Sequence, residues 1–130
     1  MKNFLFGIMV FFCGFSTYAD TLYWGASGQK PLEVAIDFLR NELPEGDSEG
    51  LQKVVLEQTN LSCLESKPCY KPMQIVLEVH DLADDSVKAI RYRLVLEQQQ
   101  SQPWQVISKE EQFLCRAGRG QADFSNKQCL

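Results

Sequence analysis

The spacing of apolar residues changes once along the chain, from helical to alternating, and this change limits the fold more than any other feature. After Pro31 the apolar side chains recur at helical intervals, with polar residues on the other side. These apolar positions are Leu32, Ile36, Leu39 and Leu43. Pro31 suits the first turn of a helix, and Pro44 ends one. The spacing therefore predicts one amphipathic helix over residues 31–43.

Beyond residue 50 the apolar residues recur at every second position, which is the period of a strand. This alternation predicts strands over 51–58, 73–80 and 90–97. A fourth strand is expected over 104–115, where the alternation breaks and predicts a bulge near 108–111. The short connections at 83–86 and 98–102 indicate antiparallel neighbours.

One helix followed by four antiparallel strands predicts a two-layer α+β domain, in which a meander sheet curls around the helix. Cystatin-like and nuclear-transport-factor-like folds have this general appearance. Ahead of the helix, Tyr23 and Trp24 form an aromatic pair. Such a pair packs over the start of a helix, or it serves as an exposed anchor for a partner.

The first nineteen residues have the three parts of a secretory signal peptide. Lys2 precedes an apolar run from Phe4 to Phe15, and small residues stand at Thr17 and Ala19 before the expected cleavage. Cys13 follows two phenylalanines instead of a small residue, which disfavours a lipoprotein. We therefore expect a signal peptide over 1–19, a single domain over 20–130, and a periplasmic or secreted protein without an integral membrane span.

The formal net charge is −4, and removal of Lys2 with the signal peptide would make it more negative. Phosphate backbones and anionic membrane surfaces attract basic proteins, so this charge argues against nucleic acid and lipid as partners. Serine-hydrolase motifs and phosphate-binding glycine loops are absent from the sequence. The sequence thus predicts no cofactor and a protein or envelope component as partner.

Four cysteines follow the signal peptide: Cys63, Cys69, Cys115 and Cys129. An even number in an exported chain indicates two disulfides, for which three connectivities exist. We favour the local pairs, Cys63 with Cys69 and Cys115 with Cys129, because each brackets a segment without helical or strand periodicity. In the chain-entropy model these two loops contribute about 2.4 and about 3 kcal/mol. A metal site is less favoured, because the chain has one histidine.

Four of the arginines, Arg91, Arg93, Arg116 and Arg119, lie in the third expected strand or just after the fourth. They predict an anion- or carboxylate-binding surface, since guanidinium groups hold carboxylates with two hydrogen bonds. The alternative is ordinary solvated charge. A hairpin pairing Leu94 with Val106 and Leu96 with Trp104 would make Glu110 a cross-strand partner of Arg91.

The C-terminal residues resemble a signature of small exported gammaproteobacterial proteins of unknown function. Those proteins end in a tryptophan-containing strand followed by Cys-x-x-Gly-Arg-Gly-His-x-x-Phe-Ser-x-x-x-Cys, and here Trp104-x-Val106 precedes Cys115 to Cys129. The resemblance implies a periplasmic location and a Cys115–Cys129 disulfide, and it brings no activity. Gln121 stands in place of the histidine, so no acid-base or metal role follows at that position.

Three functional hypotheses remain from the sequence, the third of which is an accessory protein with a structural role. The first is a non-enzymatic binding domain that uses the C-terminal loop and the arginine-bearing sheet face. The second is a ligand-binding or enzymatic domain with a pocket on the concave sheet face, where His80 or Tyr92 supplies the polar group. His80 beside Asp81 could act as a general base, but a solvent-facing histidine at a strand end is the simpler interpretation. The sequence favours recognition over catalysis.

Overall fold

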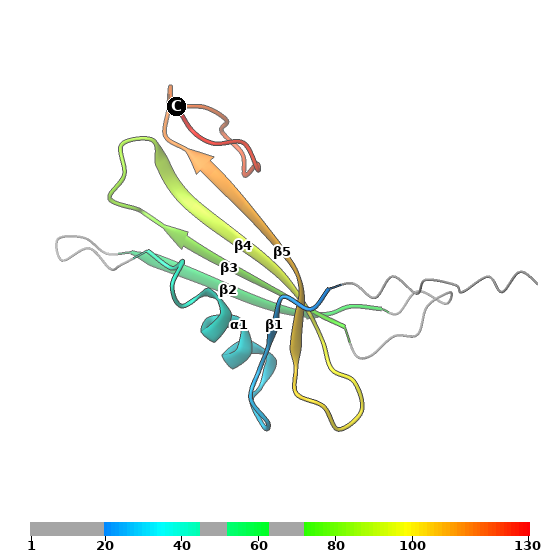
Figure 1. The fold of residues 1–130 in the computed structure, drawn as a ribbon. Coiled ribbons are helices and arrows are strands. Elements are labelled where there is room, and N and C mark those ends of the chain that lie inside the picture. The colour runs from blue at the N-terminus through cyan, green and yellow to red at the C-terminus, as the bar shows by residue number, and fades with distance from the viewer. Residues whose placement is uncertain (1–19, 45–51, 63–71) are drawn as a thin grey trace, which may run out of the picture.

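One helix lies on one face of a five-stranded antiparallel sheet in the computed structural model, which describes residues 20–44, 52–62 and 72–130 (Figure 1). The elements in chain order are β1 Tyr23–Trp24, α1 Pro31–Leu39, β2 Lys53–Asn60, β3 Met73–His80, β4 Val87–Glu97 and β5 Gln105–Cys115. The order across the sheet is β1-β5-β4-β3-β2. The predicted α+β class is confirmed, whereas the prediction of four strands is wrong. The expected signal peptide and the Cys63–Cys69 pair lie outside the described residues.

The four long strands form the predicted meander. β2 pairs with β3 from Lys53 opposite His80 to Asn60 opposite Met73. β3 pairs with β4 along its whole length, and β4 pairs with β5 in turn. Alternate residues of β3 and β4 are buried, as the alternating pattern of the sequence predicts. In the described part of the chain, no helix is long and apolar enough to cross a membrane.

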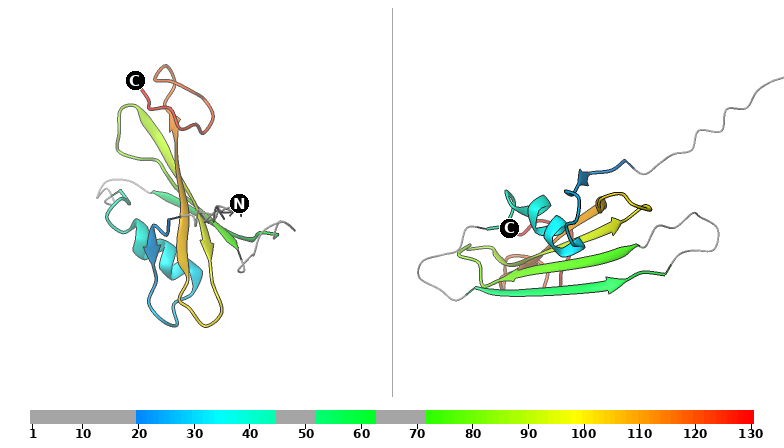
Figure 2. Two further views of the ribbon diagram at one scale, coloured as in Figure 1. Left: turned by 45° about the vertical axis from the view of Figure 1, so that its right-hand side comes forward. Right: turned by 90° about the horizontal axis from the view of Figure 1, so that it is seen from below.

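The core lies between the helix and the sheet, on the face where α1 packs (Figure 2). Its most buried side chains come from both layers: Val34, Ala35, Leu39, Ile75, Leu77, Val79, Tyr92, Leu94, Leu96 and Val106. The inward side of the helix largely matches the spacing, since Leu39 is buried and Leu32 and Leu43 pack against the core. It is rotated toward Val34 and Ala35, which are buried, whereas Ile36 is 40% exposed. Tyr23 packs on Phe38 of the helix, with ring centroids 5.7 Å apart.

The helix begins where the sequence predicts and ends earlier. The Glu33 carboxylate accepts a hydrogen bond of 2.7 Å from the Lys30 backbone N–H, which satisfies one free donor of the first turn. At the other end the Arg40 N–H donates to the Asp37 carbonyl three residues back, so the helix stops at Leu39. The chain then turns, and Leu43 still packs against the core. Leu43 is therefore apolar because it packs against the core, although it lies after the end of the helix.

The first strand, β1, is the element that the sequence did not predict. Tyr23 pairs with Val106 and Trp24 with Gln105, so β1 covers the outer edge of β5 near its start. On either side of β1, the Leu22 N–H donates to the Val106 carbonyl at 2.8 Å, and the Gly25 N–H donates to the Trp104 carbonyl at 2.9 Å. Two residues are too few to show a period, so only this pairing with a distant strand identifies them as β structure.

A bulge in β5 changes the predicted register between β4 and β5. Val95 is opposite Ser108 and Leu96 is opposite Val106, which leaves Ile107 as the extra residue, one position before the predicted stretch. The predicted pairings of Leu96 with Trp104 and of Leu94 with Val106 are both wrong, because β5 is displaced by two positions before the bulge and by three after it. Their consequence for the charged residues is also wrong: Glu110 is opposite Arg93, and Gln112 is opposite Arg91.

Candidate binding surface at the C-terminal loop

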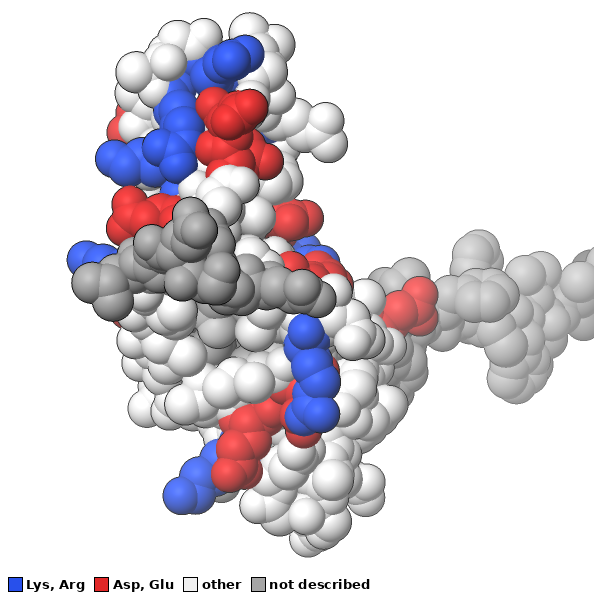
Figure 3. Space-filling view, turned by 90° about the vertical axis from the view of Figure 1, so that its left-hand side faces the viewer, with Lys and Arg blue, Asp and Glu red and all other residues white. Residues whose placement is uncertain are grey.

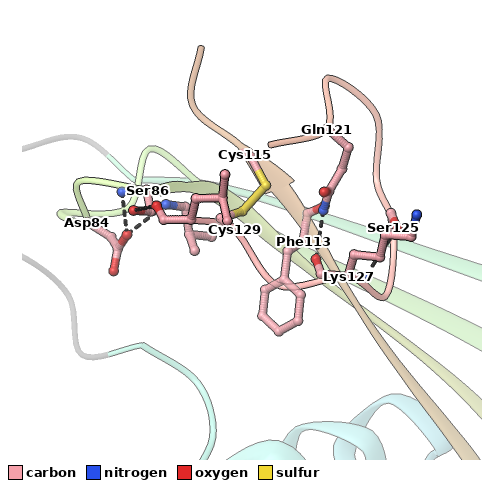
Figure 4. Close-up of a disulfide and its surroundings, with 10 residues drawn as sticks. Asp84, Ser86, Phe113, Cys115, Gln121, Ser125, Lys127 and Cys129 are labelled. Atoms are coloured by element: carbon pink, nitrogen blue, oxygen red, sulfur yellow. Dashed lines mark hydrogen bonds between the residues drawn. A yellow bond between two sulfur atoms is a disulfide. The ribbon is translucent and has the colours of Figure 1, made fainter. Parts of the chain in front are cut away.

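Residues 116–130, here called the C-terminal loop, follow β5 and return to it. The predicted Cys115–Cys129 disulfide is confirmed, with the two Cα atoms 5.5 Å apart. The bond joins the last residue of β5 to the penultimate residue of the chain (Figure 4). The segment between them has neither helical nor strand periodicity, so this covalent bond is one of the features that define its shape.

Hydrogen bonds hold the C-terminal loop along the outer edge of β5. Phe113 and Ser125 exchange backbone hydrogen bonds of 2.7 and 3.1 Å, which forms an antiparallel bridge. The Cys115 N–H donates to the Gln121 carbonyl at 3.3 Å. The Gln121 side-chain amide donates to the Phe113 carbonyl and, at 2.7 Å, to the Lys127 carbonyl (Figure 4). Gln121 therefore stabilises the loop internally.

A second set of bonds fastens the C-terminal loop to the turn between β3 and β4. The Arg116 guanidinium donates to the carbonyl oxygens of Leu82 and Asp84, both at 2.7 Å. The Arg116 N–H donates to the Ser86 carbonyl at 2.8 Å, and the Ser86 hydroxyl donates to the Leu130 carbonyl. The Leu130 N–H in turn donates to the Arg119 carbonyl at 2.7 Å. Arg116 thus has a structural role, whatever else it contacts.

The turn that receives these bonds is itself ordered by Asp84. Its carboxylate accepts backbone hydrogen bonds from Val87 at 2.6 Å and Ser86 at 2.7 Å. These two bonds, together with the nearby charge of Arg116, hold the pKa of Asp84 below its ordinary value, against a small opposing effect of burial. The C-terminal loop is therefore attached to a turn that has its own internal support.

An open hollow of about 320 Å³ lies between the turn and the end of the chain. Its lining combines polar and apolar side chains: Asp84, Ser86, Val87, Phe113, Gln128 and Cys129. Leu130 follows directly and is 82% exposed. The hollow is thus bounded by the disulfide on one side and by the β3–β4 turn on the other.

On the face of the sheet opposite α1, the C-terminal loop places Phe124 over Arg91. The Arg91 guanidinium carbon lies 3.8 Å from the centroid of the Phe124 ring, within the range of a cation–π contact. His80 lies beside the same ring and nearly perpendicular to it, with the ring centroids 6.1 Å apart. The C-terminal signature includes a phenylalanine at position 124, but no periodicity predicts where its side chain lies, because a loop places its side chains without a period.

Glu78 holds both Arg91 and His80 in place. One carboxylate oxygen accepts from the Arg91 guanidinium at 2.7 Å, and the other lies 2.7 Å from His80 Nε2. Burial opposes ionisation of Glu78, but the hydrogen bonds and charges of His80 and Arg91 together outweigh it, so the pKa of Glu78 lies below its ordinary value. The partner of Arg91 is therefore Glu78 on β3, instead of the predicted Glu110 on β5.

The four predicted arginines do not share one contact. Arg91 is bound by Glu78 and covered by Phe124. Arg93 lies 3.9 Å from Glu110, with both side chains about half exposed. Arg116 holds the β3–β4 turn, and Arg119 is exposed on the C-terminal loop. Among these four, and counting only partners in the described part of the chain, Arg119 is the guanidinium without a hydrogen bond or ion pair.

Basic and acidic side chains alternate at the end of the molecule that carries the C-terminal loop (Figure 3). The loop itself contains Arg116, Arg119 and Lys127 against one acid, Asp123, whereas the neighbouring turn contains Asp84 and Asp85. The surface at this end therefore combines both signs of charge.

The residues considered for catalysis have other partners. His80 contacts Glu78 and Phe124, as described above. The buried Tyr92 hydroxyl donates to the Glu42 carbonyl at 3.0 Å, and burial, aided by the charges of Glu111 and Glu42, raises the pKa of Tyr92 to about 12. Over residues 20–44, 52–62 and 72–130, no group of three or more potential metal ligands gathers.

No protein-family model, curated protein or solved structure matches the chain. The cystatin-like or nuclear-transport-factor-like topology and the C-terminal resemblance therefore stay predictions. What the chain can do has to be argued from its own geometry.

Proposed function

We propose that this chain is an exported, non-enzymatic binding domain that recognises a protein or envelope component through the C-terminal loop. The observation that carries the proposal is the way this loop is held. A disulfide, the bridge to β5 and the bonds of Arg116 and Leu130 to the β3–β4 turn fix it at three places. A loop that is ordered before binding loses less conformational entropy when a partner is bound.

Within this surface Arg119 is the proposed contact residue for an acidic or carboxylate group on the partner. It is exposed, and the guanidinium is the side chain best suited to hold a carboxylate with two hydrogen bonds. Arg116 and Arg91 position the surface, through the β3–β4 turn and through Phe124 respectively. Arg93 borders it on the open sheet face.

Export to the periplasm or out of the cell is part of this proposal. The Cys115–Cys129 disulfide supports it, since such bonds persist in oxidising compartments. The signal-peptide pattern of residues 1–19 and the resemblance to small exported proteins point the same way.

The alternative is a ligand-binding or enzymatic domain with its pocket on the concave sheet face. It has less support, because side chains of α1 pack on that face and its residues Ile75, Leu94 and Leu96 are fully buried. The hollow described above lies beside the disulfide instead.

Affinity capture from an envelope extract tests the proposal with three proteins: wild type, Arg119→Glu and Arg40→Glu. Arg40 is the charge control: it is an exposed arginine at the end of α1, although unlike Arg119 it is paired, with Asp37. We expect a partner that wild type and the control retain and that Arg119→Glu loses at least tenfold. Equal recovery of all partners by the three proteins would exclude recognition through Arg119.

A further inference from the structure

The outer edge of β2 has the features of an interaction surface. β2 is the last strand of the sheet, and within residues 20–44, 52–62 and 72–130 no strand pairs with its outer side. Its side chains are exposed almost throughout, including Val54 at 60% and Leu56 at 38%. An eight-residue edge strand with exposed apolar side chains and no proline is a template for pairing with another strand.

The direction of the backbone groups shows which residues of β2 offer hydrogen bonds outward. Leu61, just after β2, donates its N–H to the Pro72 carbonyl at 3.0 Å, so its backbone groups point toward the segment that enters β3. Backbone groups alternate in direction along an antiparallel strand. The N–H and C=O groups of the odd-numbered residues therefore point to β3, and those of Val54, Leu56 and Gln58 point away from the sheet.

We propose that the partner of this edge is the β2 strand of a second copy of the chain, paired antiparallel about a two-fold axis at Val55. In this register Lys53 of each copy is opposite Glu57 of the other, and Val54 is opposite Leu56. The two-fold axis repeats both contacts, so two ion pairs and two apolar pairs form. The outward groups of Val54 and Leu56 then exchange the backbone hydrogen bonds.

Neighbouring registers lack this complementarity. An axis at Leu56 would place Val55 opposite Glu57 and Val54 opposite Gln58, which sets apolar side chains against polar ones. An axis at Glu57 would place the two Glu57 carboxylates directly opposite each other, and like charges in that position are destabilising. Directly opposed residues of two paired strands have their side chains on the same face of the sheet, whereas successive residues of one strand alternate between faces. A two-fold axis that relates two antiparallel edge strands must therefore pass between two copies of the same residue. The charge pattern of β2 thus selects the axis at Val55.

The position of the helix is compatible with this joining of sheets. α1 packs against β3 and β5, so it leaves the side chains of Val54 and Leu56 exposed on the same face. The two-fold axis is perpendicular to the sheet, and both helices therefore lie on one face of the joined sheet. This edge is separate from the C-terminal loop, so the dimer could present two copies of the proposed binding surface.

Sedimentation over a concentration series of the mature chain tests the proposal. We expect a reversible dimer, a dissociation constant raised at least tenfold by Glu57→Lys or by Lys53→Glu, and recovery when the two substitutions are combined, since each ion pair is then restored with its charges exchanged. Asp85→Lys makes the same charge change in an exposed turn and is expected to leave the dimer unchanged. A monomer at all concentrations up to about millimolar, or a dimer that Glu57→Lys does not weaken, would overturn it.

Cysteine cross-linking locates the axis. In the proposed register the two Val55 residues face each other as a non-hydrogen-bonded pair with Cα atoms about 4.5 Å apart, within the range of a disulfide. Val55→Cys is expected to form a covalent dimer through residue 55 on mild oxidation. Val54→Cys is the control, because its neighbour across the axis is Leu56. Equal cross-linking of both variants, or none at residue 55, would contradict the register.

Discussion

The two edges of the sheet are treated differently by the chain. The outer edge of β5 is covered twice, by β1 at its start and by the C-terminal loop at its end, where Ser125 pairs with Phe113. The outer edge of β2 receives neither kind of cover from the described residues. Unpaired strand edges invite association, and proteins commonly cover or charge them. Among the described residues, the segments before α1 and after β5 both cover the outer edge of β5, whereas the outer edge of β2 is protected only by its own charged side chains.

Among the substitutions proposed for the two edges, removal of the Cys115–Cys129 disulfide should have the largest effect. We expect Cys115→Ser combined with Cys129→Ser to lower the free energy of unfolding by about 3 kcal/mol, because the closed loop no longer restricts the unfolded chain. Urea unfolding followed by circular dichroism measures this loss.

The native chain under reducing conditions serves as the comparison for this double substitution. If the variant and the reduced chain both unfolded at the urea midpoint of the oxidised chain, the covered edge would owe its stability to hydrogen bonds alone.

The ion pair beneath Phe124 makes the cover of β5 dependent on pH. The pKa of Glu78 is below its ordinary value of 4.5 in the folded chain. Its stabilising effect is therefore fully present above about pH 4.5 and is lost as the pH falls through the lower, folded pKa. We expect Glu78→Gln to cost about 1 kcal/mol at neutral pH and progressively less in acid. Urea titrations at several pH values measure this trend.

Glu110→Gln is the control for the same charge on the same sheet face. The Glu110 side chain is 45% exposed and lies 3.9 Å from Arg93, so its removal should change stability little at any pH. A constant difference between Glu78→Gln and wild type from pH 7 down to about pH 2 would show that ionisation of Glu78 does not stabilise the fold.

The outer edge of β2 should tolerate polar substitutions that the outer edge of β5 does not. We expect Val54→Ser, measured on dilute protein, to change the free energy of unfolding by less than about 0.5 kcal/mol, because the side chain is 60% exposed. Val106→Ser, at a fully buried position where β5 pairs with β1, should cost about 2 kcal/mol or more. Equal costs at the two positions would remove the distinction between the edges.

The parts of the fold that repeat along the sequence could be predicted from it. Alternation in 73–80 and 90–97 identified β3 and β4, since a buried face leaves a period of two. β1 has only Tyr23 and Trp24 and could not be identified by period. The end of α1 was placed too late, because Leu43 is apolar for packing reasons although the helix has already ended.

The candidate site was partly predictable. The Cys115–Cys129 pair could be predicted, since two cysteines bracketed a segment without periodicity. The predicted Glu110 partner of Arg91 is wrong because the register of β5 on β4 differs from the expected one by two positions even before the bulge at Ile107, and by three after it. Glu78 stands opposite Arg91 across the β3–β4 hairpin, so counting back from the 83–86 turn would have found it. The contact of Phe124 with Arg91 depends on how the C-terminal loop folds back, and no local pattern encodes that.

The double cover of β5 also affects the order in which the domain can assemble. The hairpins β2–β3, β3–β4 and β4–β5 join neighbours in the chain, so each closes a short loop. β1 instead pairs with a strand that is far away in the sequence. The hydrogen bond from Thr21, just before β1, to Gln105 joins residues 84 positions apart. Contacts between distant segments carry a larger entropic cost of loop closure and form more slowly. We therefore expect the meander to form first, with both of its edges unpaired, and β1 to pair with the outer edge of β5 late in folding.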